Sequence, residues 1–197
     1  MLENRPWKVL KSERIIDRGP WLSVRQELVE LPNGKQIPTW YILDFMNWVN
    51  IIAITKDGRF VLIDQYRHGI GQTHYELCAG CIDEGETPME AAKRELMEET
   101  GFGGGEWSEY MVAAPNPSNQ SNWCYTFLAV GVEQIHEQQL ESTEDIRVHV
   151  LTKDEVWRLL QSGEIVSCHY SAALWKYFAN NRFSCGDEQM LTVWRTR

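Results

Sequence analysis

Three glutamates, Glu95, Glu98 and Glu99, are spaced so that a single helix would carry them on one side. At about 100° per residue they fall within an arc of about 100°. Carboxylate oxygens that converge from one helix face are hard ligands, which suit Mg²⁺ or Mn²⁺. Two such ions can polarise a phosphoryl oxygen and produce a metal-bound hydroxide near neutral pH, so the chemistry indicated is hydrolysis at a phosphorus centre. If these glutamates stood alone, a solvated acidic face would be the simpler interpretation.

The sequence around the glutamates predicts the helix that must position them. Thr87 can cap its start, Pro88 suits the first helical position, and Glu90 can complete a capping box. Gly101 supplies a left-handed stop. An apolar stripe faces the core and consists of Met89, Ala92 and Leu96. We expect Arg94 to relieve part of the repulsion between the carboxylates through Glu90 and Glu98.

The segment from Gly80 to Phe102 also matches a longer pattern, G-x5-E-x7-R-E-U-x-E-E-x-G-U, where U is an aliphatic or aromatic residue. The nine matching positions are Gly80, Glu86, Arg94, Glu95, Leu96, Glu98, Glu99, Gly101 and Phe102. This pattern is the Nudix box, and the chain therefore resembles the Nudix hydrolases. The resemblance implies an α/β/α sandwich and a metal-dependent hydrolase acting on a nucleoside diphosphate derivative.

Composition limits the other classes of function. The 197 residues suffice for one well-cored domain with a small appendage, and the net charge of −9 argues against a nucleic-acid surface. Bound divalent cations would let so acidic a protein accept an anionic substrate. No window is long and apolar enough to cross a membrane, and the first ten residues lack an export signal, so we expect a cytoplasmic protein. The pair Cys78 and Cys81 is interpreted as packing residues in a tight turn rather than a metal or redox site.

The remaining patterns predict a mixed central sheet with helices, which is an α/β sandwich. We divide the chain into an N-terminal antiparallel piece (1–45), a Nudix domain (46–182) and a C-terminal tail of uncertain structure (183–197). The expected strands are Lys11–Asp17, Trp21–Glu30, Gln36–Leu43, Val49–Thr55, Phe60–Tyr66, Trp107–Ala113, Trp123–Val130 and Arg147–Leu151. Val49–Thr55 and Phe60–Tyr66 form a hairpin around Asp57 and Gly58, and residues 68–73 are read as a loop. Two further helices follow Thr152 and Ser167.

Segments outside the box are similar to the branch that hydrolyses ADP-ribose and related nucleoside diphosphate sugars. These segments are Gln65–Arg67, Glu76–Gly80, Pro117 and Glu144–Val148. Members of this branch use an N-terminal three-stranded piece to form an interlocked homodimer, which is therefore expected here. A small sheet of that kind is marginally stable on its own and needs either the main domain or a second subunit to cover it.

The same resemblance implies the roles of the site residues. Glu95, Glu98, Glu99 and the carbonyl of Ala79 bind Mg²⁺, with Mn²⁺ as an alternative, while Glu86 and Arg94 hold the box in shape. Arg67 and Glu76 meet the pyrophosphate and its metals. Glu144 is the candidate base for the attacking water, with Glu141 in reserve. Trp123 is our choice for stacking on the nucleobase, from the candidates Trp7, Trp21, Trp40, Trp48 and Trp123. His68 and His74 flank the site in sequence.

Two departures from that branch leave other substrates open. Cys78 replaces the usual proline, and Pro115–Asn122 lacks the P-G-[FY]-[ST]-x-E type of sequence. A relative acting on GDP-mannose, CDP-type or dinucleotide substrates is therefore an alternative within the enzyme class. From another class, the alternative is a non-catalytic sensor of nucleotide sugars, against which the complete carboxylate set argues.

Overall fold

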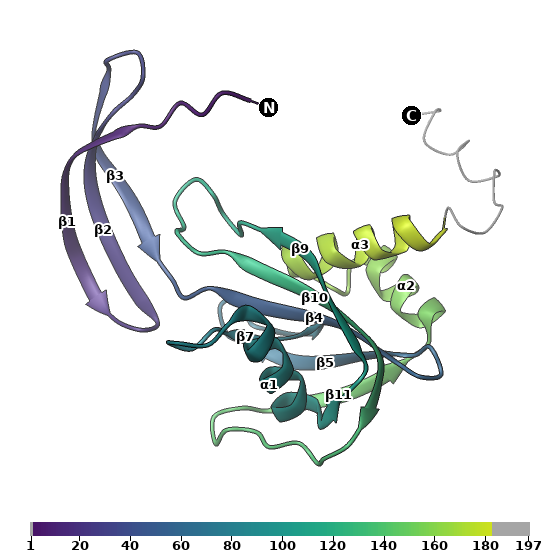
Figure 1. The fold of residues 1–197 in the computed structure, drawn as a ribbon. Coiled ribbons are helices and arrows are strands. Elements are labelled where there is room, and N and C mark those ends of the chain that lie inside the picture. The colour runs from purple at the N-terminus through teal and green to yellow at the C-terminus, as the bar shows by residue number, and fades with distance from the viewer. Residues whose placement is uncertain (1, 183–197) are drawn as a thin grey trace.

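The computed structural model describes residues 2–182 and contains two sheets and three helices (Figure 1). A three-stranded sheet at the N-terminus stands to one side of a larger body, in which an eight-stranded sheet packs between helices. The strands are β1 (Lys8–Arg18), β2 (Leu22–Glu30), β3 (Gln36–Asp44), β4 (Trp48–Thr55), β5 (Phe60–Arg67), β6 (Gln72–Glu76), β7 (Cys78–Cys81), β8 (Phe102–Gly103), β9 (Glu106–Ala113), β10 (Cys124–Gln134) and β11 (Ile146–Leu151). The helices are α1 (Pro88–Thr100), α2 (Lys153–Ser162) and α3 (Cys168–Arg182).

The N-terminal sheet has the order β1-β2-β3 with antiparallel pairs throughout. Its three strands were predicted from the sequence, and Gly34 makes the turn between β2 and β3 with φ of 80°. Every residue of β1 is exposed, whereas β2 contains buried residues. The sheet therefore leaves the whole of its edge strand β1 uncovered.

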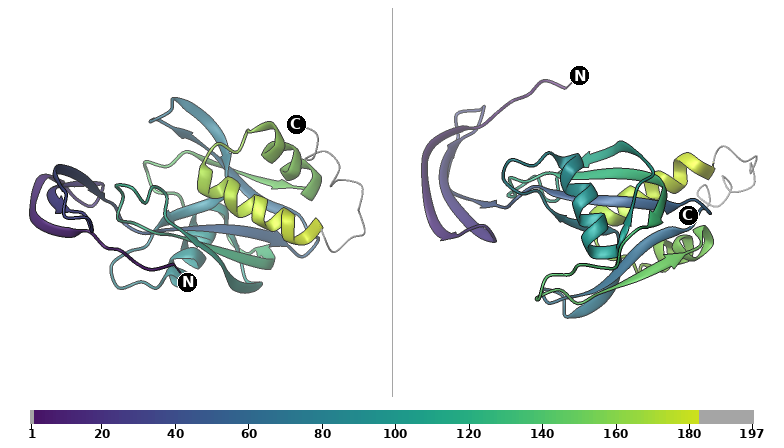
Figure 2. Two further views of the ribbon diagram at one scale, coloured as in Figure 1. Left: turned by 90° about the horizontal axis from the view of Figure 1, so that it is seen from above. Right: turned by 60° about the horizontal axis from the view of Figure 1, so that its bottom comes forward.

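The larger sheet is mixed, because β4 and β10 run parallel while their other neighbours are antiparallel. Its longest path has the order β11-β5-β4-β10-β8, with β6, β7 and β9 paired to β5, β4 and β10. One apolar cluster packs α1 against the sheet through Ala92 and Leu96, and a second packs α2 and α3 through Val156 and Leu174. Helices thus cover both faces (Figures 1 and 2), which confirms the predicted α/β/α Nudix-type architecture.

The predicted hairpin of β4 and β5 is present, but its strands pair only at Ala53 with Val61 and Ile54 with Phe60. Beyond these two pairs, β4 pairs with β7 and β5 pairs with β6. The prediction of a loop up to residue 73 was wrong in its extent, since β6 begins at Gln72. β6 ends at Glu76, and β7 begins at Cys78, two residues later. Because β6 pairs with β5 and β7 pairs with β4, the sheet opens between β6 and β7. Side chains from both edges of this opening line one cavity.

Helix α1 has the ends that its sequence predicts. The Thr87 side chain accepts a hydrogen bond from the backbone N–H of Glu90, the Glu90 carboxylate accepts from the backbone of Thr87, and Gly101 caps the other end with φ of 73°. The tail 183–197 lies outside the described residues, and the division of the chain into domains stays a prediction. No helix within residues 2–182 is long and apolar enough to span a membrane.

Candidate active site

Arg94 lies at the centre of the carboxylates of α1. Its Nε and Nη2 atoms donate to the two oxygens of Glu86 at 2.9 and 3.0 Å, and Nη1 donates to Glu95 at 2.8 Å and Glu98 at 3.0 Å. Nη2 also donates to the carbonyl of Cys81 at 3.1 Å. The expected partner Glu98 is therefore present, whereas Glu90 is used in the helix cap. One guanidinium thus ties the loop before α1 to the helix.

The first strand of the box, β7, lies directly against the carboxylates of Glu95 and Glu99. A Cβ atom added to Gly80 would come within 2.0 Å of the Glu95 carboxylate, so this carboxylate rests on the Gly80 backbone. The Glu99 carboxylate accepts a hydrogen bond from the N–H of Ala79 at 3.0 Å and another from the Cys78 thiol. The backbone of residues 79 and 80 is therefore held between two carboxylates of the same helix face.

Burial changes the acidity of these carboxylates. Desolvation raises the pKa of Glu99 to about 8, and it also raises the pKa of Glu95, although the charge of Arg94 opposes the shift at Glu95. A cation bound next to Glu95 and Glu99 would stabilise the charged form of these two buried carboxylates. This donor set of hard oxygens fits a divalent cation.

The residues described contain no group of three or more His, Cys, Asp or Glu side chains already arranged to hold a metal ion. The reason is visible in the hydrogen bonds, since Glu95 and Glu98 point to Arg94 and Glu99 points to β7. Binding of a cation would therefore require Glu95 and Glu98 to exchange part of their contact with Arg94 for the ion.

Arg67 and Glu76 come from the other edge of the opened sheet and form a two-pronged ion pair. Nε of Arg67 donates to both Glu76 oxygens at 2.9 and 3.1 Å, and Nη2 donates at 2.6 Å. This pairing raises the pKa of Arg67, so the guanidinium stays charged. Glu76 is 3% exposed, while the Arg67 side chain is 43% exposed, which leaves part of the guanidinium accessible to an anion.

The acidic loop between β10 and β11 is anchored to the C-terminal end of α1. Gln139 donates its N–H to the carbonyl of Glu98 at 2.9 Å, and the Gln138 side chain donates to the carbonyl of Glu99 at 2.7 Å. Glu144 folds back within this loop and accepts from the N–H of Glu141 at 2.9 Å. The charge of Glu144 reaches Glu95 and Glu99, where it contributes to their raised pKa. The hydrogen bonds of Gln138 and Gln139 therefore hold the loop that contains Glu144 at the C-terminal end of α1.

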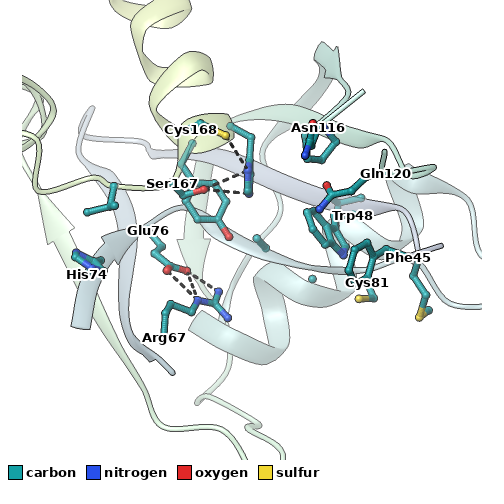
Figure 3. A pocket seen from close by; sticks show the side chains of 18 of the residues that line it. Phe45, Trp48, Arg67, His74, Glu76, Cys81, Asn116, Gln120, Ser167 and Cys168 are labelled. Atoms are coloured by element: carbon teal, nitrogen blue, oxygen red, sulfur yellow. Dashed lines mark hydrogen bonds and ion pairs between the residues drawn. The ribbon is translucent and has the colours of Figure 1, made fainter. Parts of the chain in front are cut away.

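A cavity of about 750 Å³ lies beside these groups (Figure 3). Arg67 and Glu76 line one part of it, together with Ala79 and Gly80, behind which Glu95 and Glu99 lie. The complete lining is Pro20, Trp21, Phe45, Met46, Trp48, Val49, Arg67, Ile70, His74, Glu76, Ala79, Gly80, Cys81, Pro115, Asn116, Gln120, Val166, Ser167, Cys168, His169 and Tyr170. The cavity therefore joins the N-terminal piece, both edges of the opened sheet, the β9–β10 loop and the start of α3.

The aromatic residues of the cavity differ from the sequence-based choice. Trp123 is 49% exposed and does not line the cavity, whereas Trp21 and Trp48, which were among the candidates, do. His74 lines it as well, but His68 does not. His169 and Tyr170 were not predicted, because they belong to a helix far from the box in sequence and only the packing of α3 brings them here. Cys78 is buried in the core beside α1, as its interpretation as a packing residue predicted.

Both parts of the chain match known protein families. Residues 45–170 match the family described as "NUDIX domain", and residues 7–43 match "Nucleoside diphosphate sugar hydrolase N-terminal domain". An "ADP-ribose pyrophosphatase" of Bacillus subtilis (strain 168) is 28% identical over 168 residues, which are 85% of this chain and 90% of that protein. A "Methanol dehydrogenase activator" of Bacillus methanolicus is 31% identical over 160 residues, covering 80% and 85%.

A solved structure described as "Crystal structure of ADP compounds hydrolase" has the same fold, with a TM-score of 0.76 and 22% identity over 92% of this chain and 98% of that one. The family match extends over more than half of the chain and includes the whole carboxylate helix with its Arg94 network. The chain therefore belongs to the Nudix family of hydrolases.

Proposed function

We propose that the protein hydrolyses the pyrophosphate bond of ADP-ribose or a related ADP-sugar, with Mg²⁺, to AMP and a sugar phosphate. The observation that carries this proposal is that the Arg67–Glu76 pair lines the same cavity as the Ala79–Gly80 backbone, against which the carboxylates of Glu95 and Glu99 lie. Relatives described as ADP-ribose pyrophosphatases in Bacillus subtilis and Mycobacterium tuberculosis support the choice of substrate.

In this proposal Glu95, Glu98, Glu99 and the carbonyl of Ala79 hold the metal. A bound divalent cation neutralises charge on the pyrophosphate and lowers the pKa of water. Mn²⁺ offers the same oxygen-ligand chemistry and is the alternative ion. Arg94, held by Glu86, keeps the loop and the helix in register.

The remaining groups act on the substrate and on the attacking water. Arg67 binds a phosphate oxygen with the part of its guanidinium that Glu76 leaves free. The Glu144 carboxylate accepts the proton of the attacking water, and Glu141 is the alternative general base. Attack at one phosphorus breaks its bond to the bridging oxygen, which leaves with the other phosphate.

We also propose a homodimer built through the N-terminal sheet. Large apolar side chains on β1 are exposed, including Val9, Ile15 and Ile16 at 51%, 44% and 41%. A second copy is the partner that would cover this surface, because a sheet of three strands needs packing on one face for stability.

The substrate is tested by measuring turnover of ADP-ribose, ADP-glucose, GDP-mannose, UDP-glucose, NADH and ATP with Mg²⁺, and by identifying the nucleotide product chromatographically. We expect ADP-ribose or ADP-glucose to give the highest kcat/KM and to release AMP. A preference for GDP-mannose or for a dinucleotide would replace the ADP-sugar proposal while retaining the metal site. Turnover of none of these compounds would contradict the proposed function.

A further inference from the structure

The cavity has one charged end and one neutral end. Among the described residues that line it, Arg67 and Glu76 are the ones with Arg, Lys, Asp or Glu side chains, and they bind each other. Away from them, Figure 3 shows Trp48 and Phe45 together with the amide side chain of Gln120. Phosphates have counter-charges at the first end only. The other end suits a flat, uncharged group that needs few hydrogen bonds.

Trp48 is held rigidly in the wall of this neutral end. It lies on β4 between two paired strands, opposite Cys81 of β7 and Cys124 of β10, and its backbone N–H donates to the backbone carbonyl of Trp123 at 2.9 Å. Its ring contacts Phe45, with centroids 6.2 Å apart, and His169, with centroids 5.9 Å apart and ring planes at 35°. An aromatic surface fixed in this way loses little conformational entropy when a ligand stacks on it.

His169 completes the same wall from the first turn of α3. Its ring lies 3.2 Å from the Ser167 hydroxyl and contacts Tyr170, with centroids 4.4 Å apart. Burial, assisted by the charge of Arg67, lowers the pKa of His169 to about 4, so the imidazole is uncharged at neutral pH. A neutral ring beside Trp48 favours an uncharged aromatic ligand over a second anion.

We propose that Trp48 and His169 form the wall against which the nucleobase of the substrate lies, and that Asn116 and Gln120 contact the edge of the base. Side-chain amides both donate and accept hydrogen bonds, as the edge of a nucleobase requires. This inference rests on the proposed function and assigns the nucleoside half of the substrate to the neutral end of the cavity. The sugar phosphate half then lies on the other side of Arg67, and Trp123 has no role in binding the base.

The test compares the binding of the two product halves. Isothermal titration calorimetry would give the Kd of AMP, GMP, CMP and UMP, which share one phosphate and differ in the base, and of ribose 5-phosphate, which lacks a base. The proteins are the wild type, Trp48→Ala, Trp48→Phe and His169→Gln. The control is Trp175→Ala, which removes a half-exposed tryptophan of α3 that does not line the cavity.

We expect Trp48→Ala to weaken the tightest nucleotide by about fivefold or more, the lower end of the range for a stacked base. His169→Gln should weaken it as well, Trp48→Phe should restore most of the affinity, and ribose 5-phosphate and Trp175→Ala should show no change. If Trp48→Ala does not fold, as judged by circular dichroism, His169→Gln still tests the wall, and unchanged nucleotide affinity in that variant alone would then overturn the inference.

Unchanged nucleotide affinity in both Trp48→Ala and His169→Gln would overturn the inference, as would a loss confined to ribose 5-phosphate. Failure of the proposed function is separate, since it appears as absent turnover of nucleotide sugars by the wild type.

Discussion

At Gly80, the missing side chain decides where the Glu95 carboxylate can lie. An added Cβ would come within 2.0 Å of that carboxylate, which is inside van der Waals contact, and the atoms it meets belong to a proposed metal ligand. The glycine of the box is therefore explained by contact with Glu95 rather than by its own backbone conformation, since it does not have a positive φ.

Gly80→Ala should displace Glu95 while leaving the fold intact. Because misplacement of a site group by about 1 Å can cost about a hundredfold in rate, we expect a fall in kcat/KM of that order. The measurement is steady-state turnover alongside circular dichroism. The matched control is Gly69→Ala, where an added Cβ meets nothing within 4 Å and φ is not positive. Equal activity in the two variants would contradict the assigned role of Glu95.

Single residues of the box could be assigned from the sequence, because the motif fixes their spacing on one helix. The contact of Arg94 with Glu98 was predicted from helical spacing and is present, as is the contact with Glu86 that the family resemblance implied. The residues that form the cavity wall could not be predicted from sequence spacing. Trp48 lies on β4 and His169 on α3, and only tertiary packing brings their rings together. Trp123 was chosen by its position in the sequence, which does not reveal which tryptophans the fold brings to the cavity.

On the scale of elements, Asp64 joins β5 to β11 through two side chains of β11. Its carboxylate accepts from Nε of Arg147 at 2.9 Å and lies 2.6 Å from Nε2 of His149. Burial raises the pKa of Asp64, but these two contacts outweigh it, so the pKa is lowered from the ordinary value of 3.8. The carboxylate therefore stabilises the folded protein above that value, and its contribution is lost as the pH falls through the folded-state pKa.

We expect Asp64→Asn to lower the free energy of unfolding at pH 7 by about 1 to 3 kcal/mol, as for other hydrogen bonds to buried charged groups. The difference from wild type should shrink as the pH falls below about 4, because the wild-type carboxylate then becomes protonated. Urea unfolding between pH 3 and pH 8 would measure both effects. The exposed Asp145→Asn serves as the control, and a difference that is constant with pH would refute the explanation.

Elements with local signals were predicted well from the sequence, and pairing between distant strands was not. The caps of α1 and the turn of β2 and β3 depend on a few adjacent residues, such as Thr87, Glu90 and Gly34. The early end of the β4–β5 pairing depends instead on β7, which pairs with β4 from Trp48 to Ile51. No pattern within β4 predicts that β7 replaces β5 as its partner there.

On the scale of the whole molecule, the exposed β1 predicts that two chains associate. Light scattering after size-exclusion chromatography should give twice the mass of the 22.9 kDa chain. Ile16→Lys, which places a charge on the exposed strand, should shift the protein toward the monomer, whereas Val112→Lys, on the exposed side of β9, should not. A monomeric wild type at micromolar concentration would contradict the proposed dimer.

The central claim is that the carboxylate face of α1 hydrolyses a pyrophosphate with a divalent cation. The most direct measurement is AMP release from ADP-ribose by EDTA-treated protein titrated with Mg²⁺, for wild type, Glu99→Gln and the exposed control Glu109→Gln. We expect activity that appears only with added Mg²⁺ in wild type and Glu109→Gln. In folded Glu99→Gln the activity should fall by more than about a hundredfold, as expected when several kcal/mol of metal-dependent stabilisation are lost. Wild-type activity that survives without any divalent cation, or Glu99→Gln that matches wild type, would contradict it.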